Sequence, residues 1–333
     1  MNTEKPRRRQ RYHGKNPRHF SEKYKEHAPE RYAEDVARVL ERGRTPAGTH
    51  RPIMVREVME VLAPQPGEVV VDCTLGYGGH AAVMLQAIQP GGRLIGLDVD
   101  PIELPKTEAR LRALGFSPAT FTVHRTNYAG LARLLPEPVD IVLADLGLSS
   151  MQMDNPARGF TYKVDGPLDL RMNPQRGQPA TALLASLNES ALATLLLEHA
   201  DEPAADRMAR AILRVPISTT RQLTAVIRGS GGDDDSVRRV FQALRIAVNN
   251  EFGALDEFLR NLPLCLKAGG RVAILTFHSG EDRRVKKWFR SGERDGTYSE
   301  IAHEVVRPSA EELRANPRSR SAKLRWARAA DFH

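Results

Sequence analysis

Three aspartates have the spacing of a ligand site at the ends of neighbouring strands. Asp72, Asp98 and Asp145 each close an apolar run that is typical of a buried strand. Asp98 lies 22 residues beyond Gly76, where a carboxylate can accept hydrogen bonds from both hydroxyls of a ribose. If the strands are parallel, the three carboxylates meet at one edge of the sheet and make that edge acidic.

A glycine-rich turn follows the first of these runs. Glycine allows the backbone to approach a ligand where a Cβ would collide, and a helix start adds free N–H groups. The register Gly76-x-Gly78-Gly79 departs from the dinucleotide pattern, and the anionic Asp72 would repel a pyrophosphate. The same charge suits the sulfonium and ammonium groups of S-adenosylmethionine, which is therefore the favoured cofactor. A purely structural turn remains the alternative.

Asp145 is the candidate catalytic residue. The exocyclic amine of a pyrimidine is a poor nucleophile because its lone pair is delocalised into the ring. A carboxylate that accepts its N–H bonds would localise the lone pair, stabilise the developing positive charge and offer a proton acceptor. The alternative for Asp145 is a cap for the next helix. Ser149 and Ser150 lack the G-x-S-x-G pattern of hydrolases, and His278 with Ser279 is as compatible with a helix cap as with a triad.

The runs that carry these residues alternate with helical patterns, which predicts an α/β fold with a doubly wound parallel sheet. We expect strands at 68–73, 93–98, 121–124, 139–145 and 269–278, a last antiparallel strand at 322–327, and helices at 80–89 and from 100. Between them, residues 155–180 are rich in Gly, Pro, Arg and Asp, and residues 181–260 show several helical patterns, one of them at Arg238–Val248. The predicted organisation is a basic, disordered extension at 1–48, a Rossmann-like domain at 49–154 and 250–330, and an inserted, mostly helical substrate-recognition domain at 155–249.

Composition and charge narrow the class of protein. The 333 residues are 41% hydrophobic and 27% charged, as in a globular protein, and no apolar run is long enough for a membrane span. Two cysteines and no signal peptide indicate a cytoplasmic protein. Residues 1–51 carry a net charge of +7 and residues 271–333 a net +5, whereas residues 52–270 carry −4. Basic ends indicate a nucleic-acid partner, with a solvated basic surface as the alternative.

Six segments resemble, in order, the signatures of one family: 72–80, 145–150, 158–172, 241–246, 277–279 and 316–320. The family is the ribosomal RNA small-subunit methyltransferase H family, also called MraW. The resemblance spans about residues 50–329, and 158–172 is its most specific part. It implies a Rossmann-like methyltransferase with an inserted helical domain, which transfers a methyl group from S-adenosylmethionine to the N4 amine of a cytidine in the decoding region of 16S ribosomal RNA. Cys73 stands where the family usually has glycine, and Pro105 interrupts a usual helix.

The resemblance also assigns residues. The implied cofactor contacts are Gly78, Gly79, His80, Asp98, Tyr128, Asp145 and Gln152, to which the charge argument adds Asp72. For three of them a structural role is the alternative: a polar helix cap for His80, a core aromatic for Tyr128 and a surface loop for Gln152.

Five residues are the candidates for RNA contact: Arg158, Phe160, Arg171, Arg318 and Arg320. Arginine neutralises phosphates and stacks on bases, and an aromatic ring offers a platform for a displaced base. An internal Arg–Asp network is the alternative for Arg171. We expect no catalytic metal, and the sequence does not determine the oligomeric state. The expected protein is a cytoplasmic rRNA methyltransferase of ribosome biogenesis that acts on 16S rRNA within the small subunit. An RNA-binding assembly factor with a vestigial cofactor site and a nicotinamide-dependent enzyme are the alternatives.

Overall fold

Seven strands form one sheet in the computed structural model, which describes residues 52–331; the predicted extension at 1–48 lies outside this range. Across the sheet the strand order is β3-β2-β1-β4-β5-β7-β6. The strands are β1 (Val69–Asp72), β2 (Arg93–Asp98), β3 (Phe121–Arg125), β4 (Val139–Asp145), β5 (Leu266–Thr276), β6 (Tyr298–Ile301) and β7 (Lys323–Ala329). Strands β1 to β5 pair in parallel, while β7 runs antiparallel to both β5 and β6. The predicted parallel sheet and its last antiparallel strand are confirmed.

The strands differ from the prediction where the apolar pattern is weak. Strands β2 and β4 have the predicted ends. Strand β6 was not predicted, because its four residues include the exposed Ser299 and Glu300 and form an edge of the sheet. Strand β5 begins three residues before the predicted start at Gly269, and the register of its pairing with β4 shifts between Val139 and Ile141.

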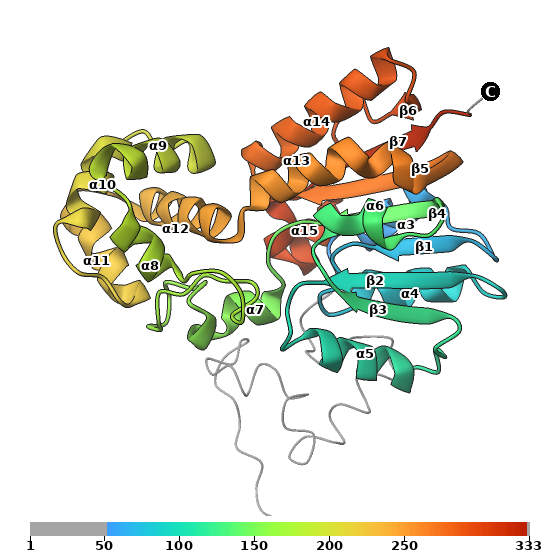
Figure 1. The fold of residues 1–333 in the computed structure, drawn as a ribbon, viewed down its shortest axis with the longest axis horizontal. Helices are drawn as coiled ribbons and strands as arrows, with labels where there is room; N and C mark the ends of the chain where they lie inside the picture. The colour runs from blue at the N-terminus through green and yellow to red at the C-terminus, as the bar shows by residue number, and fades with distance from the viewer. Residues whose placement is uncertain (1–51, 332–333) are drawn as a thin grey trace, which may run out of the picture. The chain divides into compact units, whose positions relative to one another are not determined.

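Helices cover both faces of the sheet (Figure 1). One face packs on a core with α3 (Val55–Leu62), α4 (Gly79–Ala87) and α5 (Leu104–Ala113). The other packs on a core with α6 (Leu131–Leu134), α13 (Glu251–Asn261), η4 (Leu262–Cys265) and α14 (Ser279–Arg294). Alternate residues of a strand face opposite cores: Ile141 and Leu143 of β4 face the first, and Val142 and Ala144 the second. Short elements complete this part: η2 (Tyr128–Gly130), α15 (Ala310–Ala315) and η5 (Pro317–Ser321).

Two departures noted in the sequence cause no disruption. Pro105 does not interrupt the helix, because α5 begins at Leu104 and the proline falls in its first turn, where no N–H is needed. Cys73 is 2% exposed within the sheet core, and burial raises the pKa of its thiol. It is a small buried hydrophobe and not an exposed, reactive thiol.

Between β4 and β5 the chain forms a group of helices around a core of its own (Figure 1). Its elements are α7 (Ser150–Asp154), η3 (Pro156–Arg158), α8 (Ala180–Ser186), α9 (Glu189–Ala200), α10 (Ala205–Leu213), α11 (Thr220–Gly229) and α12 (Asp234–Asn249). The longest, α12, begins four residues before the predicted start at Arg238. The Asp233 carboxylate accepts a hydrogen bond from Ser236 N at 2.8 Å, and Asp234 and Asp235 complement the positive end of the helix dipole.

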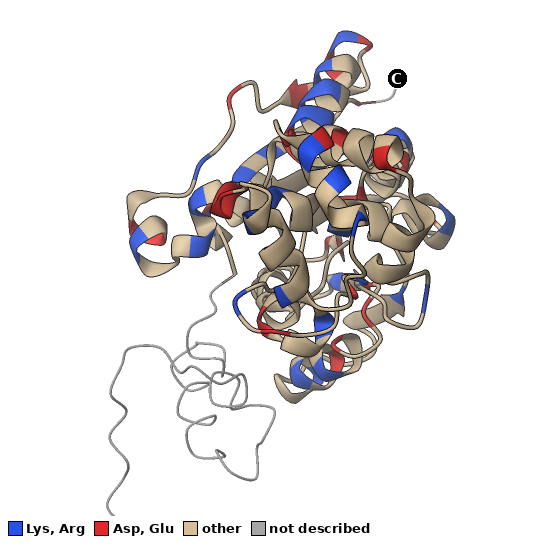
Figure 2. Cartoon of the chain, turned by 90° about the vertical axis from the view of Figure 1, so that its left-hand side faces the viewer, with Lys and Arg blue, Asp and Glu red and all other residues tan. Residues whose placement is uncertain are grey.

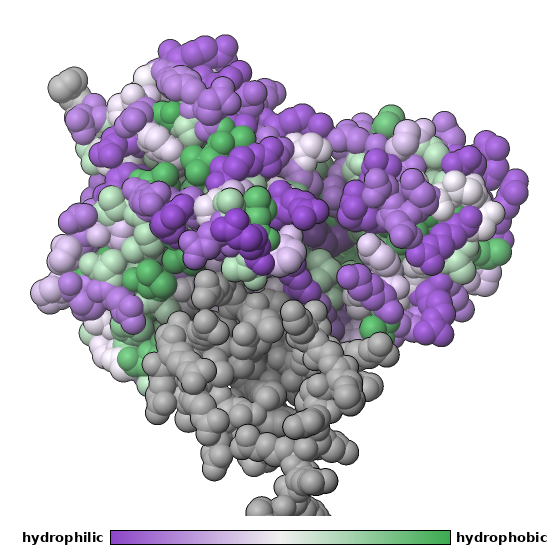
Figure 3. Space-filling view, turned by 180° about the vertical axis from the view of Figure 1, so that it is seen from behind, coloured by the Kyte–Doolittle hydropathy of each residue, from purple (hydrophilic) through white to green (hydrophobic). Residues whose placement is uncertain are grey.

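Large apolar side chains that reach the surface are scattered over this described part of the chain. They are Ile102, Leu114, Val164, Leu197, Val215, Leu264 and Leu313, which lie on separate elements. The space-filling view shows a mainly hydrophilic face with small hydrophobic areas (Figure 3). None of the helices within residues 52–331 has the length and apolar character needed to span a membrane.

Candidate active site

The order of the strands reverses between β1 and β4, and parallel sheets bind ligands at the carboxyl ends of strands at such a point. Asp72 ends β1 and Asp145 ends β4, so both predicted carboxylates lie at this reversal. Thr74 links them: its backbone N–H donates to Asp72 Oδ1 at 3.1 Å, and its hydroxyl accepts from Asp145 N at 2.6 Å. Asp98 ends the adjacent strand β2. The structure therefore brings the three predicted carboxylates to one edge.

The three carboxyl groups are hard to ionise in this setting. Burial raises the pKa of Asp72 to about 7, of Asp98 to about 6 and of Asp145 to about 8. Mutual repulsion adds to the effect, since the charge of Asp98 raises the pKa of Asp72 and the charge of Asp72 raises that of Asp145. A cation placed among them would relieve both penalties. The edge is thus suited to a positively charged ligand.

His80 lies beside Asp145 as a neutral imidazole. Burial lowers the pKa of His80 to about 4. Its Nε2 is 3.0 Å from the carbonyl oxygen of Ile53, which can only accept, so Nε2 carries the proton. Nδ1 then presents a lone pair 3.7 Å from Asp145 Oδ2. His80 is not a helix cap, because the N-cap of α4 is Gly78.

The glycine turn is held against the carboxylates and requires its glycines. Asp98 Oδ2 accepts from Gly76 N at 2.8 Å, which joins the turn to the end of β2. Gly78 has φ of 77°, a conformation that side chains disfavour. A Cβ on Gly79 would lie 2.2 Å from Pro52 Cγ. The glycines are thus required by the positive φ of Gly78 and by packing against Pro52, which is the structural role given above as the alternative.

Asp100 organises the site, although sequence reasoning treated it only as a helix start. It is fully buried, and its Oδ2 accepts hydrogen bonds at 2.8 Å both from Gln152 Nε2 and from Arg158 Nη1. Its backbone N–H donates to Asp98 Oδ1 at 2.9 Å. Because Gln152 and Arg158 lie 52 and 58 residues along the chain, no local pattern indicates these contacts. Asp100 thus connects the end of β2 to the segment that follows β4.

Gln152 and Tyr128 are both packed inside the protein. Gln152 is 7% exposed, and its Oε1 accepts from Ser149 N at 3.0 Å, so it does not lie on a surface loop. Tyr128 is half-buried on η2 and makes an edge contact with Phe258, with ring centroids 5.3 Å apart. That contact is the core packing given above as its alternative role.

Two of the predicted RNA contacts are placed in the interior, which argues against that role. Arg158 is 6% exposed, and besides Asp100 it binds the carbonyl oxygens of Arg171 and Met172 at 3.2 and 2.7 Å. Phe160 is 5% exposed within the core of the helical segment. Their physical task in this structure is to hold the loop that follows α7. The buried position of Arg158 was not predicted from the sequence, because arginine is rarely buried unless it is paired.

The remaining three candidates are arginines with more access to solvent. Arg171 is tied to Asp169 by two hydrogen bonds of 2.8 and 2.7 Å, which is the internal network given as its alternative. Arg318 is exposed on η5 and pairs with Asp154 at 2.7 Å. Arg320 is exposed on the same short helix. The structure does not gather all five predicted RNA residues on one surface.

The observed helix caps settle the alternative roles given above for Asp145 and for His278 with Ser279. The cap of α7 is Ser149, in a capping box with Gln152, so Asp145 does not cap that helix. His278 is the N-cap residue of α14, and the Glu281 carboxylate accepts from Phe277 N at 2.8 Å. Ser279 Oγ donates to Asp201 at 3.1 Å, away from His278. These residues form a helix cap and not a nucleophilic triad.

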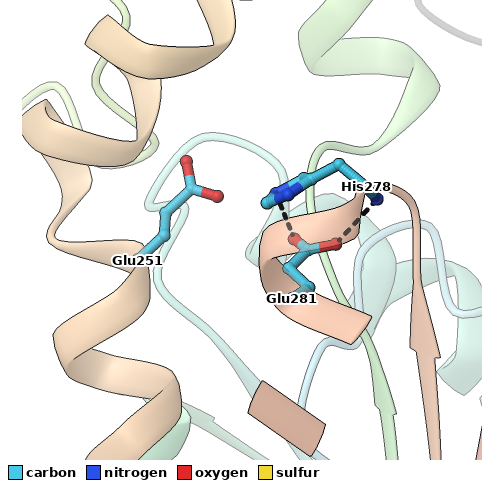
Figure 4. Close-up of side chains that lie close together, drawn as sticks. All are labelled: Glu251, His278 and Glu281. Atoms are coloured by element: carbon cyan, nitrogen blue, oxygen red, sulfur yellow. Dashed lines mark hydrogen bonds and ion pairs between the residues drawn. The ribbon is translucent and has the colours of Figure 1, made fainter. Parts of the chain in front are cut away.

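Glu251, His278 and Glu281 form the one group with the spacing of a metal site among residues 52–331 (Figure 4). Both of its carboxylates are already engaged. Both oxygens of Glu251 bind the Arg245 guanidinium at 2.7 and 2.9 Å, and Glu281 Oε1 lies 3.1 Å from His278 Nε2. A metal ion would be placed next to a buried guanidinium, which repels it. The cluster instead stabilises the start of α13 and α14.

The fold and the acidic strand edge together define an S-adenosylmethionine-dependent methyltransferase with a Rossmann-like sheet. The comparison with known families agrees with this class. Residues 47–330 match the model of the MraW methylase family. The chain belongs to this family, as its sequence motifs predicted.

Individual relatives support the assignment over the full length. "Ribosomal RNA small subunit methyltransferase H 2" of Alkaliphilus metalliredigens is 50% identical, with 97% of this chain and 98% of the relative covered. "Ribosomal RNA small subunit methyltransferase H 1" of Lachnoclostridium phytofermentans is 48% identical, with 96% and 92% covered. These shares require most of the first 45 residues to be aligned. Most of the N-terminal extension, which lies outside the family model, is thus aligned with these relatives.

Proposed function

We propose that this protein methylates the N4 amine of a cytidine in the decoding region of 16S ribosomal RNA, as part of the cytoplasmic biogenesis of the small ribosomal subunit. Membership of the MraW methylase family supports the reaction class. The observation that carries the assignment of the site is the position of Asp145. It lies at the acidic edge of the sheet, with the lone pair of a neutral His80 beside it.

The residues fit S-adenosylmethionine on chemical grounds. Asp72 and Asp145 compensate positive charge, and their pKa values fall toward the ordinary range when a cation binds next to them. Asp98 accepts hydrogen bonds from the backbone N–H groups of Gly76, Asp100 and Val99, and a carboxylate has about four acceptor positions, so it can also accept from a ribose hydroxyl. Gln152 retains one amide N–H beside its bond to Asp100, and Gly78, Gly79, Tyr128 and His80 complete the proposed contacts.

Asp145 prepares the amine. When bound, S-adenosylmethionine supplies a methyl group whose carbon is electrophilic because it is bonded to a positively charged sulfur. The Asp145 carboxylate accepts an N4–H bond and so localises the lone pair of the amine. With the donor bound, N4 would take the methyl group and the electron pair of the S–C bond would stay on sulfur, so that the positive charge would pass to N4 beside the Asp145 carboxylate. The proton that N4 then loses passes to the Asp145 carboxylate, whose pKa is raised again by burial and by the charge of Asp72 once no cation lies beside it.

The test is methyl transfer to small subunits that lack the modification, with labelled S-adenosylmethionine, nuclease digestion and mass analysis of the nucleosides. We expect N4-methylcytidine, and a loss of kcat of about 10²–10⁴-fold in Asp145→Asn. Asp140→Asn is the matched control, because Asp140 lies on the same strand at its other end and pairs with Lys267 at 2.8 Å.

Each other outcome has a distinct meaning. An Asp145→Asn variant that methylates as fast as the wild type would refute the role of Asp145. Label in another nucleoside would retain the methyltransferase and reject the target. Absence of label in both subunits and bare RNA, with measurable binding of S-adenosylmethionine, would favour an RNA-binding assembly factor with a vestigial cofactor site.

A further inference from the structure

Helix α14 carries a stripe of positive charge that the active site does not use. Four cationic side chains, Arg283, Lys287, Arg290 and Arg294, recur at i, i+4, i+7 and i+11, and all four are exposed. At 3.6 residues per turn this spacing places them on one side of the helix. Figure 2 shows blue bands along this helix, at the top of the molecule. We name these four residues the α14 stripe.

The opposite side of α14 is committed to the core. Val285 and Phe289 are at most 1% exposed and pack among the residues that cover the sheet. The helix is therefore held rigidly, and its charges are presented outward at fixed positions. The outward side lacks the apolar residues that an interfacial membrane helix would insert.

The charges of the α14 stripe are only partly compensated. Arg283 pairs with Asp201 at 3.1 Å, a contact in which both side chains are more than half exposed. Lys287, Arg290 and Arg294 make no ion pair with any residue from 52 to 331. Two acids flank Arg294 in the sequence: Glu293 lies 3.2 Å from His303 Nε2, and Asp295 has its pKa lowered in part by the charge of Arg294. The other cation of the central turns, Lys286, also makes no ion pair within the described range. Three cations without ion pairs on one side of a rigid helix indicate a partner whose negative charges are regularly spaced.

The position of α14 connects this stripe to the proposed active site. The helix begins three residues after β5, whose Leu275 pairs with Asp145. Its Asp282 binds Lys323 and Arg325 of β7 at 3.1 and 2.7 Å, which places the preceding η5, with Arg318 and Arg320, at the same edge of the sheet. The α14 stripe then runs from this edge over about 16 Å, at 1.5 Å per residue.

We propose that the α14 stripe is a docking surface for the phosphate backbone of ribosomal RNA outside the active site. A length of about 16 Å can face several consecutive phosphates of a strand, which recur about every 3.4 Å along a duplex axis. Such contacts carry no sequence information and set the position of the RNA on the protein. This inference rests on the proposed action on RNA and adds the surface that holds the substrate while a single nucleotide enters the site.

The test uses the full-length protein with Lys287→Glu/Arg290→Glu. RNA binding is measured with a 16S rRNA fragment over a range of KCl concentrations, next to the binding of S-adenosylmethionine. We expect the Kd for RNA to rise about tenfold or more, and the plot of log K against log salt to lose about 1.4 to 1.8 in slope, for two phosphates. The Kd for S-adenosylmethionine stays at the wild-type value, and the loss in methylation appears in KM for RNA.

The control is Arg93→Glu/Arg133→Glu, which makes the same change in charge at two exposed arginines near the amino ends of β2 and β4. An unchanged Kd and salt slope in the α14 variant, or an equal loss in the control, would overturn the proposal. Lys287→Gln/Arg290→Gln gives the same test with less repulsion if the double glutamate variant folds poorly. RNA binding is read without turnover, so a chain that binds RNA through the α14 stripe but transfers no methyl group would refute only the proposed function.

Discussion

The buried pair between Arg158 and Asp100 leads to a quantitative prediction. Their side chains are 7% and 1% exposed, and the Nη1–Oδ2 distance is 2.8 Å. Arg158→Met keeps the apolar stem but removes the donors to Asp100 and to two backbone carbonyls. Loss of one partner from a buried pair costs about 3–5 kcal/mol, because the other charge stays buried without compensation. Asp100 keeps its bond from Gln152, so we expect the lower end of this range.

The measurement is the free energy of unfolding of the full-length protein in urea. The matched control is Arg210→Met, which removes an exposed pair with Glu189 of similar length, 3.0 Å, and should cost less than about 1 kcal/mol. The double variant Asp100→Asn/Arg158→Met should lose less free energy of unfolding than the two single variants lose together, because it leaves no unpaired charge. A loss in Arg158→Met no larger than in the control would refute the reasoning that this pair holds the loop after α7 to the end of β2.

Four more predictions concern the site and the buried cysteines. Affinity for S-adenosylmethionine, measured by calorimetry, should rise from pH 5.5 to 8 as Asp72 and Asp145 ionise, and more weakly in Asp145→Asn. Without ligand the free energy of unfolding should fall over the same interval, because the folded chain binds protons that the unfolded carboxyls release; a rise would contradict the raised pKa values. Gly79→Ala should lose about 1–3 kcal/mol, since its Cβ meets Pro52, whereas Gly229→Ala, with open space around it, should lose nothing in the same urea titration. The two buried cysteines should resist a thiol reagent until the protein unfolds, and rapid labelling of the native protein would show that they are accessible.

Local patterns were sufficient for the elements that position the site. Apolar runs ending at Asp72, Asp98 and Asp145 predicted three strands, and alternation with helices predicted that they are parallel. A carboxylate at the carboxyl end of such a strand must lie at the ligand-binding edge. Its position can therefore be predicted without knowing which residues surround it in space. The polar strand β6 gave no comparable signal, because it forms by pairing at the edge of the sheet. The early start of α12 was also missed, because it depends on a single cap at Asp233.

The functions of the polar residues around that edge could not be predicted in the same way. Arg158 has the composition of an RNA contact, yet its charge is neutralised in the interior by Asp100, 58 residues earlier in the chain. The protonation of His80 depends on the carbonyl of Ile53, 27 residues before it. Burial and long-range partners set these properties, and neither is encoded in spacing along the chain.

The sequence by itself thus determined the family, through its six motifs, and the parallel strands that end at the three carboxylates of the acidic edge, since motifs and periodicity are local properties. The order of the strands came from the structure. The tertiary structure decided which arginines are structural and which are free. A guanidinium paired in the core, as in Arg158, cannot also neutralise a phosphate, whereas Lys287 and Arg290 on the outer side of α14 remain available to do so. The physical reason is desolvation: an ion leaves water only where folding brings a partner to it.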